Sequence, residues 1–172
     1  MNIYLIGYRG SGKTTIGKKI SKSLKFVFSD TDELIVQNEK RSIPEIFATS
    51  GEQYFREKES EILRRVAFIN RTVVATGGGI ILSEANRALI KKTGFCVYLK
   101  AGNKILSSRI EGDDNRPPLT GLSLSAEIEN VLRTRAPLYE ITADMTVDTG
   151  SLSPENCSEI IIDSFTKWRR RK

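Results

Sequence analysis

The sequence predicts an α/β fold in which a parallel β-sheet is covered by helices on both faces. Five short apolar stretches rich in strand-favouring residues alternate with segments whose apolar residues recur at helical spacing. A glycine-rich segment joins the first stretch directly to the first helical segment, which is the arrangement of a strand–turn–helix unit. With 172 residues, the chain is expected to form one domain, residues 1–172, with a substantial core.

Each predicted strand is a short apolar run followed by turn-forming residues. The five strands are expected at residues 2–6, 26–29, 72–75, 95–99 and 145–147. Helices are expected at about 15–24, 33–39, 43–49, 83–92 and 102–111, and longer ones are expected to begin at about 52, 125 and 154. Ser42 and Glu45 have the spacing of a capping box, and Gly51 is expected to break the chain between two helices.

The composition is typical of a globular protein and excludes several kinds of site. Hydrophobic residues make up 39% of the chain and charged residues 28%, and no apolar run approaches the length of a membrane-spanning helix. The absence of histidine excludes Ser-His-Asp and Cys-His catalysis, so acid–base chemistry is left to Asp, Glu, Lys or Tyr. Two cysteines are too few for a disulfide framework, and no basic segment precedes the first apolar run. We therefore expect a cytoplasmic protein without a signal peptide or a membrane partner.

The net charge of +6 is concentrated at the C-terminus. Residues 167–172 contain five basic residues and no acidic one, so the rest of the chain has a net charge of only +1. Such a basic tail is expected to be a solvated, frayed end. We therefore expect no nucleic-acid partner, although an RNA-associated tail is an alternative that the charge leaves open.

The glycine-rich segment Gly7–Thr14 matches the phosphate-binding P-loop pattern G-x-x-x-x-G-K-[ST] without a mismatch. Its glycines allow backbone N–H groups to approach an anion at the positive end of the following helix. Lys13 is expected to reach the β- and γ-phosphates, and the Thr14 hydroxyl is expected to bind Mg²⁺. The motif therefore predicts a nucleotide-binding site.

Two further segments follow predicted strands at the same edge of the sheet. Asp30 and Asp32 are suited to a Mg²⁺-bound water and to accepting hydrogen bonds from a hydroxyl, but one of them could simply cap the next helix. The three glycines at 77–79 indicate close approach of the backbone either to a ligand or to a packed helix. Their place at the carboxyl edge of the sheet favours the ligand.

Residues 112–121 are rich in turn-forming residues and show no periodicity. In a protein with a P-loop, such a segment is a candidate lid. Arg116 within it has the chemistry needed to close on a transferred phosphoryl group. Spacing alone does not exclude an ordinary surface loop.

Six motifs occur together and in a fixed order along the chain. They are Gly-x-x-Gly-x-Gly-Lys-Thr at 7–14, Asp-Thr-Asp at 30–32, Gly-Glu-x-x-Phe-Arg at 51–56, Thr-Gly-Gly-Gly at 76–79, Arg-Pro at 116–117 and Arg-Ala-Pro-Leu-Tyr at 135–139. In their combination and spacing, the sequence resembles the shikimate kinases from residue 7 to about residue 154.

The resemblance implies a three-layer, P-loop NTPase-type fold of the nucleoside-monophosphate-kinase kind, with a five-stranded parallel sheet flanked by helices. It also implies a lid at about 112–124 and a small helical substrate-binding subregion at about 33–59. The implied reaction is ATP-dependent phosphorylation of the 3-hydroxyl of shikimate, which gives shikimate 3-phosphate and ADP in the route to chorismate and aromatic amino acids. The implied oligomeric state is a monomer.

The resemblance also implies roles for individual residues. Lys13 and Arg116 would neutralise charge on the transferred phosphoryl group, and Asp32 would accept hydrogen bonds from the acceptor hydroxyl. Thr14 would bind Mg²⁺ directly and Asp30 through water. The residues expected around shikimate are Asp32, Phe47, Phe55, Arg56, Gly77, Gly78, Gly79 and Arg135. The residues expected around ATP are Gly10, Ser11, Gly12, Lys13, Thr14, Thr15, Arg109, Arg116 and Pro154.

Two other functions stay open at this point: a different small-molecule kinase of the same fold, such as a gluconate or nucleotide kinase, and a P-loop binding module without acceptor-stimulated turnover. Arg56 and Arg135 together with Asp32 favour an anionic polyol, because two guanidinium groups bind one carboxylate well. The sequence departs from the family pattern at Pro118, where a leucine is expected. It also departs at residues 149–154, which lack the polar or basic residues expected of an adenine-binding loop.

Replacing Arg116 by alanine tests the expected function of the lid. We expect kcat to fall by about 10³–10⁵, the range lost when a comparable arginine is removed from other phosphoryl-transfer enzymes. Steady-state ADP release with Mg-ATP and shikimate measures this change, with a Lys167→Ala variant of the basic tail as the control. Near-normal turnover of Arg116→Ala contradicts the assignment of this residue to the transfer step.

Overall fold

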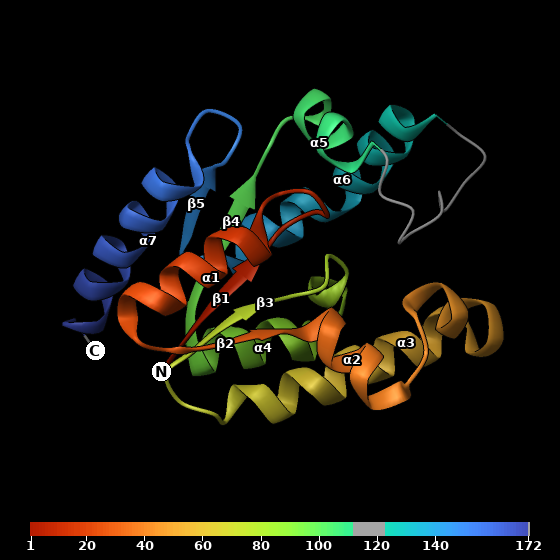
Figure 1. Cartoon of the computed structure of the whole chain (residues 1–172), viewed down its shortest axis with the longest axis horizontal. Coiled ribbons are helices and arrows are strands. Elements are labelled where there is room, and N and C mark those ends of the chain that lie inside the picture. The colour runs from red at the N-terminus through yellow and green to blue at the C-terminus, as the bar shows by residue number, and fades with distance from the viewer. Residues whose placement is uncertain (112–122, 172) are drawn as a thin grey trace.

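A single sheet of five parallel strands lies at the centre of the molecule (Figure 1). A computed structural model describes residues 1–111 and 123–171. The strands are β1 (Asn2–Ile6), β2 (Val27–Asp30), β3 (Thr72–Ala75), β4 (Gly94–Lys100) and β5 (Met145–Asp148), and their order in the sheet is β2-β3-β1-β4-β5. The predicted α/β fold with a five-stranded parallel sheet is confirmed, and the strand boundaries differ from the predicted ones by at most one residue.

Helices follow every strand. They are α1 (Lys13–Leu24), α2 (Thr31–Glu39), α3 (Ile43–Ala67), the 3₁₀ helix η1 (Ile80–Leu82), α4 (Glu84–Thr93), α5 (Asn103–Ile110), α6 (Leu124–Thr142) and α7 (Pro154–Arg169). Among the described residues, no helix is both long and apolar enough to cross a lipid bilayer. The sequence did not predict η1, a single turn that connects the three glycines to α4.

The two faces of the sheet bury alternate residues of each strand, as a pleated strand requires. Ile3 and Leu5 of β1 face a core that is completed by α1 and α7. Tyr4 and Ile6 face a larger core with side chains from α3, α4 and α6. The chain is therefore built in three layers, and the helices on both sides hold the sheet rigid.

All strands point toward the same edge of the sheet, so the turns that follow them lie close together in space (Figure 1). The central strand β1 pairs with β3 on one side and β4 on the other. In open parallel sheets, ligands bind outside the carboxyl ends of the strands where the strand order reverses. The P-loop leaves β1 at this position.

Side-chain caps begin several helices and fix the loops in front of them. The predicted capping box is present at α3, where Ser42 and Glu45 satisfy each other's backbone N–H groups. The Asp30 carboxylate accepts a hydrogen bond from the Asp32 N–H at 3.0 Å and so caps α2. Ser153 caps α7 in the same way, ahead of Pro154.

Gly51 divides α3 into two helical parts, as the sequence predicted. Its backbone angles, φ 82° and ψ 171°, lie in a region that is open essentially to glycine alone. The first part carries Phe47 toward the second part, where Phe55 is 1% exposed. The break therefore folds residues 43–50 back against the second part of the helix.

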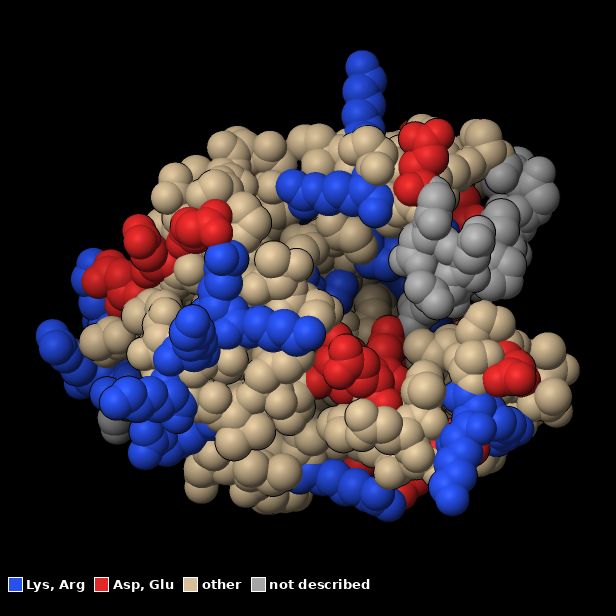
Figure 2. Space-filling model, viewed as in Figure 1, with Lys and Arg blue, Asp and Glu red and all other residues tan. Residues whose placement is uncertain are grey.

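The end of the chain differs from the prediction. The sequence analysis treated residues 167–172 as a frayed basic tail, but α7 continues through Lys167 to Arg169. Lys167 pairs with Asp163 one turn earlier at 2.6 Å, and Trp168 packs on Phe165, so helical contacts extend into the basic segment. Basic side chains gather over the C-terminal ends of α1 and α7, at the left of Figure 2.

Replacing Gly51 by alanine is expected to destabilise the fold by about 1–3 kcal/mol, because alanine is strained at these backbone angles. A Cβ at this position meets no atom within 4 Å, so the cost comes from the backbone and not from a clash. Urea unfolding followed by circular dichroism measures the change. Gly102→Ala is the matched control, since its surroundings are equally open and its φ of −68° suits alanine. Equal stability of the two variants contradicts the strain.

Candidate active site

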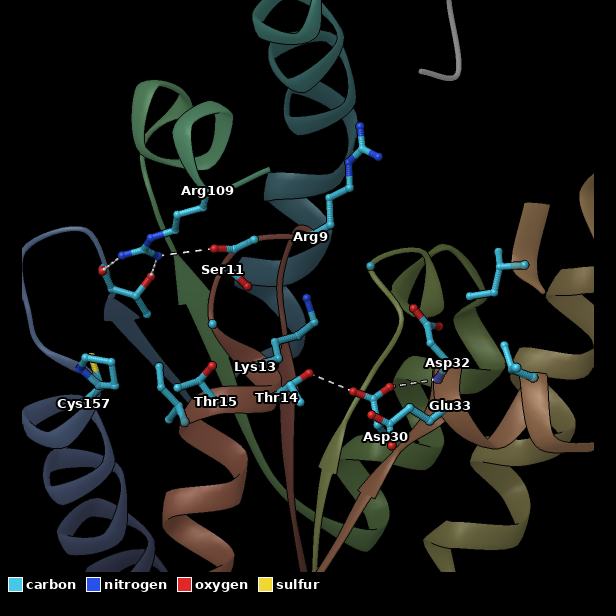
Figure 3. A pocket seen from close by; sticks show the side chains of 18 of the residues that line it. Arg9, Ser11, Lys13, Thr14, Thr15, Asp30, Asp32, Glu33, Arg109 and Cys157 are labelled. Carbon is cyan, nitrogen blue, oxygen red and sulfur yellow. Dashed lines mark hydrogen bonds between the residues drawn. The ribbon is translucent and has the colours of Figure 1, made fainter. Parts of the chain in front are cut away.

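The turns at the carboxyl edge of the sheet enclose a cavity of about 970 Å³, which we call the P-loop cavity. Figure 3 shows side chains directed into it from the P-loop, the start of α1 and the start of α2. Figure 2 shows the same face hollowed between basic and acidic side chains. Its size is at the upper end of the range for small-molecule sites, which suits a nucleotide.

The P-loop has the backbone conformation that its glycines predict. Gly7, Gly10 and Gly12 have φ angles of 145°, 76° and 91°, and α1 begins directly afterwards at Lys13. The positive end of the α1 dipole therefore faces the cavity. The Ser11 hydroxyl is buried and has no hydrogen-bond partner among the described residues, so it is available to a ligand in the loop.

The side chain of Lys13 is held against the P-loop by hydrogen bonds to the backbone of the loop. Its ammonium group donates hydrogen bonds to the carbonyl oxygens of Gly7 at 2.9 Å and Tyr8 at 2.8 Å. These contacts keep the positive charge above the loop, where the phosphates of a nucleotide would lie.

Thr14 and Asp30 meet across the cavity floor. The Thr14 hydroxyl donates a hydrogen bond to Asp30 Oδ2 at 2.9 Å, while Asp30 Oδ1 caps α2 (Figure 3). Hydroxyl and carboxylate oxygens are the ligands that Mg²⁺ prefers. The two residues therefore fit a magnesium ion. Of the alternatives that the sequence left open for Asp30, the helix cap is observed, and the magnesium role stays a prediction.

Arg109 joins the P-loop to the turn that follows β5. Its guanidinium group donates to the Thr149 carbonyl at 2.7 Å, to the Thr149 hydroxyl at 3.2 Å and to the Gly10 carbonyl at 3.3 Å (Figure 3). Pro154 and Leu152 line the same end of the P-loop cavity. The two predicted adenine contacts, Arg109 and Pro154, therefore lie together although the sequence of residues 149–154 is atypical.

A second cavity of about 410 Å³, which we call the acceptor cavity, adjoins the first. Arg9, Ile43, Pro44 and Gly78 line both cavities, so the two lie side by side and share this wall. The rings of Phe47 and Phe55, 4.9 Å apart, form an apolar side. The cationic residues that line the acceptor cavity are Arg9, Arg56 and Arg135, and the acidic ones are Glu52 and Glu127.

Arg56 is fixed by carboxylates of its own helix. It pairs with Glu59, which is 1% exposed, and with Glu52 at 3.0 Å. Burial lowers the pKa of Arg56, but the Glu59 and Glu52 carboxylates raise it, and the net shift is upward. Arg56 lies directly over Gly79, since a Cβ at Gly79 would be 2.1 Å from Arg56 Nη1. The two carboxylates therefore hold the guanidinium group in one place and stabilise its positive charge.

The three glycines take different positions. Gly78 lines both cavities, Gly79 lines the acceptor cavity, and Gly77 lines neither. The Gly77 N–H donates to the Thr31 hydroxyl at 2.9 Å, and a Cβ there would be 2.3 Å from Glu59 Oε1 and 2.6 Å from Asp32 Oδ1. Gly77 is thus required for packing against the buried Glu59 carboxylate and the half-buried Asp32, while Gly79 makes room for Arg56.

The predicted residues separate into the two cavities. Asp32 lines the P-loop cavity, close to the wall that it shares with the acceptor cavity. Arg116 lies outside the described residues, as does nearly all of the predicted lid. The predicted residues that line the acceptor cavity are Phe47, Phe55, Arg56, Gly78, Gly79 and Arg135. The predicted residues that line the P-loop cavity are Gly10, Ser11, Gly12, Lys13, Thr14, Thr15, Asp30, Asp32, Gly78, Arg109 and Pro154.

Sequence reasoning missed several residues that shape the cavities. The missed residues that line the acceptor cavity are Tyr8, Arg9, Glu127 and Val131. Glu59, which forms an ion pair with Arg56, was missed as well. One available signal was the spacing of Glu127, Val131 and Arg135 along a predicted helix, which places all three on one face.

Comparison with known proteins agrees with this geometry. The sequence model of the family described as Shikimate kinase matches residues 9–166. A shikimate kinase of Thermodesulfovibrio yellowstonii is 39% identical over 171 residues, covering 99% of this chain and 98% of the relative. The chain belongs to the shikimate kinase family. Its activity is that of the family, the ATP-dependent phosphorylation of shikimate.

Solved structures of this family have the same fold. The shikimate kinase of Acinetobacter baumannii, solved in complex with shikimate, superimposes with a TM-score of 0.92 at 33% identity, covering 96% of this chain and 93% of the other. A gluconokinase of Sinorhizobium meliloti has a TM-score of 0.64 at 15% identity, covering 99% of this chain and 94% of the other. The second comparison shows a shared fold alone.

Replacing Gly79 by alanine is expected to displace Arg56 without unfolding the protein, because the clash is with the end of a flexible side chain. Losing a charge-assisted hydrogen bond to the acceptor weakens binding by about tenfold or more, so the KM for shikimate should rise by that factor. Steady-state kinetics with varied shikimate and varied ATP measure the change, with Gly102→Ala as control. An equal rise in both KM values contradicts a local effect on Arg56.

Proposed function

We propose that this chain transfers the γ-phosphoryl group of ATP to the 3-hydroxyl of shikimate, with ATP in the P-loop cavity and shikimate in the acceptor cavity. The observation that carries the proposal is the common wall of the two cavities at Arg9 and Gly78. A phosphate held by the P-loop and a hydroxyl of a ring in the acceptor cavity would meet at this wall. Holding both reactants in place is a large part of catalysis in phosphoryl transfer.

The donor side binds the triphosphate by charge and by backbone dipoles. The N–H groups of residues 10–15 and the Lys13 ammonium group surround the position of the phosphates, and Ser11 offers its buried hydroxyl. Arg109, Thr149 and Pro154 form the far end of the cavity, where the adenine would lie. Arg116 would add a further positive charge at the transferred group.

The acceptor side matches a small ring that carries one carboxylate. Arg56 and Arg135 would bind the carboxylate, and Phe47 and Phe55 would cover the apolar face of the ring. Asp32, near the common wall, would accept a hydrogen bond from the reacting hydroxyl and orient it toward the phosphate. The carboxylate of Asp32 is also suited to hold the hydroxyl proton as the bond to phosphorus forms.

Thr14 and Asp30 would hold Mg²⁺, Thr14 directly and Asp30 through water. The fit rests on their oxygen atoms, which lie 2.9 Å apart at the floor of the P-loop cavity. When bound, the ion would neutralise charge on the phosphates.

We further propose a single-domain monomer that works in the cytoplasm, with the substrate-binding subregion at about 33–59 and the lid at about 112–124. The two cysteines are free and buried, which suits a reducing compartment.

The proposal is tested by the choice of acceptor. We expect ADP release with Mg-ATP alone to be slow, and shikimate to stimulate it strongly while gluconate and AMP do not. Arg135→Ala should lower the stimulation at limiting shikimate and keep ATP binding, measured separately by calorimetry. Stimulation by gluconate or AMP would contradict the acceptor site, and ATP binding without stimulation by any of the three would favour a binding module.

A further inference from the structure

One face of α6 carries four residues spaced by four positions: Glu127, Val131, Arg135 and Tyr139. Such spacing keeps side chains on one side of a helix. The first three line the acceptor cavity, and Tyr139 lies at the same face, where its hydroxyl donates to the Gly78 carbonyl. Arg135 therefore lies between two residues that attach α6 to turns at the edge of the sheet.

The first attachment joins α6 to the P-loop. Glu127, in the first turn of α6, is 1% exposed and accepts a hydrogen bond from Arg9 at 3.2 Å. A buried carboxylate is costly without a cation, so the ion pair with Arg9 stabilises Glu127 in this position. In Figure 3, the Arg9 side chain is directed away from Lys13 and toward α6. The ion pair thus fixes the start of α6 to the loop that binds the phosphate donor.

The second attachment joins the other end of α6 to the glycine turn after β3. Tyr139 is fully buried, stacks on Tyr98 with ring centroids 4.9 Å apart, and donates to the Gly78 carbonyl at 2.5 Å. This contact holds the last turns of α6 but not the first. The orientation of the helix over the acceptor cavity is therefore set by both ends together.

Arg135 has no ion pair with a carboxylate in the part of the chain that the structure describes, residues 1–111 and 123–171. Arg56, in contrast, is held by Glu52 and Glu59. A polar neighbour of Arg135 is the Tyr139 hydroxyl of the same helix, so the place of the Arg135 guanidinium group depends on the place of that helix. A shift of α6 would move Arg135 and leave Arg56 unchanged.

We propose that Arg9 is a positioning residue for the acceptor site: its ion pair with Glu127 holds α6 so that Arg135 meets the acceptor carboxylate. The inference rests on the proposed function, in which Arg135 binds shikimate. Arg9 also lines the acceptor cavity, so Glu127→Gln, which keeps the Arg9 charge, tests the action through Glu127 and α6.

A double-mutant cycle tests the ion pair. Arg9→Met and Glu127→Gln should each raise the KM for shikimate by about tenfold. Glu127→Gln should leave the KM for ATP within about twofold, because Glu127 lines the acceptor cavity and not the P-loop cavity. The double variant should be no worse than either single variant, because the pair is broken once. Arg9→Lys, which keeps the charge, should restore part of the affinity. Calorimetric titration with shikimate alone should rank the variants in the same order by their dissociation constants as the KM values do.

Lys100→Met is the matched control, because Lys100 pairs with Glu140 of the same helix at 3.5 Å, on the surface and outside both cavities. It should leave the kinetics unchanged, and circular dichroism should show all variants folded. A main effect of Glu127→Gln on the KM for ATP overturns the inference, as do additive effects in the cycle. If Arg135→Ala itself leaves the KM for shikimate unchanged, the acceptor site assigned above is wrong. If only Arg135→Ala raises it, the proposed function stands and the positioning inference fails.

Discussion

Every strand of this sheet runs in the same direction, and this constraint places the whole site. The carboxyl ends of β1, β2, β3 and β5 reach one edge, so the P-loop, Asp30, the three glycines and Thr149 meet there although they are far apart in the chain. The helices on both faces bury alternate strand residues and hold the edge rigid. A site that must place a phosphate and a hydroxyl in contact depends on such rigidity, because small displacements cost much of the rate.

The geometry of the site also depends on the partners that hold charged side chains in place at the carboxyl edge of the sheet. Isolated buried charges are costly, so each is supplied with partners from the protein. Lys13 bonds to two carbonyl oxygens of its own loop, Arg56 to two glutamates of its own helix, and Glu127 to Arg9. These partners fix the charges before any ligand arrives. A preorganised site of this kind spends little energy on rearrangement when the transferred group develops charge.

Local signals predicted the strands, most helix starts and the P-loop, because each depends on residues that are neighbours in the chain. The resemblance to a family then predicted most residues that line the two cavities. The Arg9–Glu127 pair was missed, since its members are 118 residues apart and nothing in either neighbourhood indicates the other. The functions of Gly77 and Gly79 could not be separated by sequence either, because only the tertiary contacts with Asp32, Glu59 and Arg56 distinguish them. The helical end of α7 was missed because its charge suggested a solvated tail.

The balance of charge in the acceptor cavity gives a physical reason for its selectivity. Three arginines and two glutamates line it, so the lining carries one net positive charge. An acceptor with a single carboxylate would neutralise it, whereas a neutral polyol would leave this positive charge without a counter-charge. A nucleotide would bring additional negative charge into about 410 Å³ that already contains Glu52 and Glu127. We therefore expect Glu52 and Glu127 to disfavour more highly charged acceptors, so that discrimination would rest on repulsion as well as attraction.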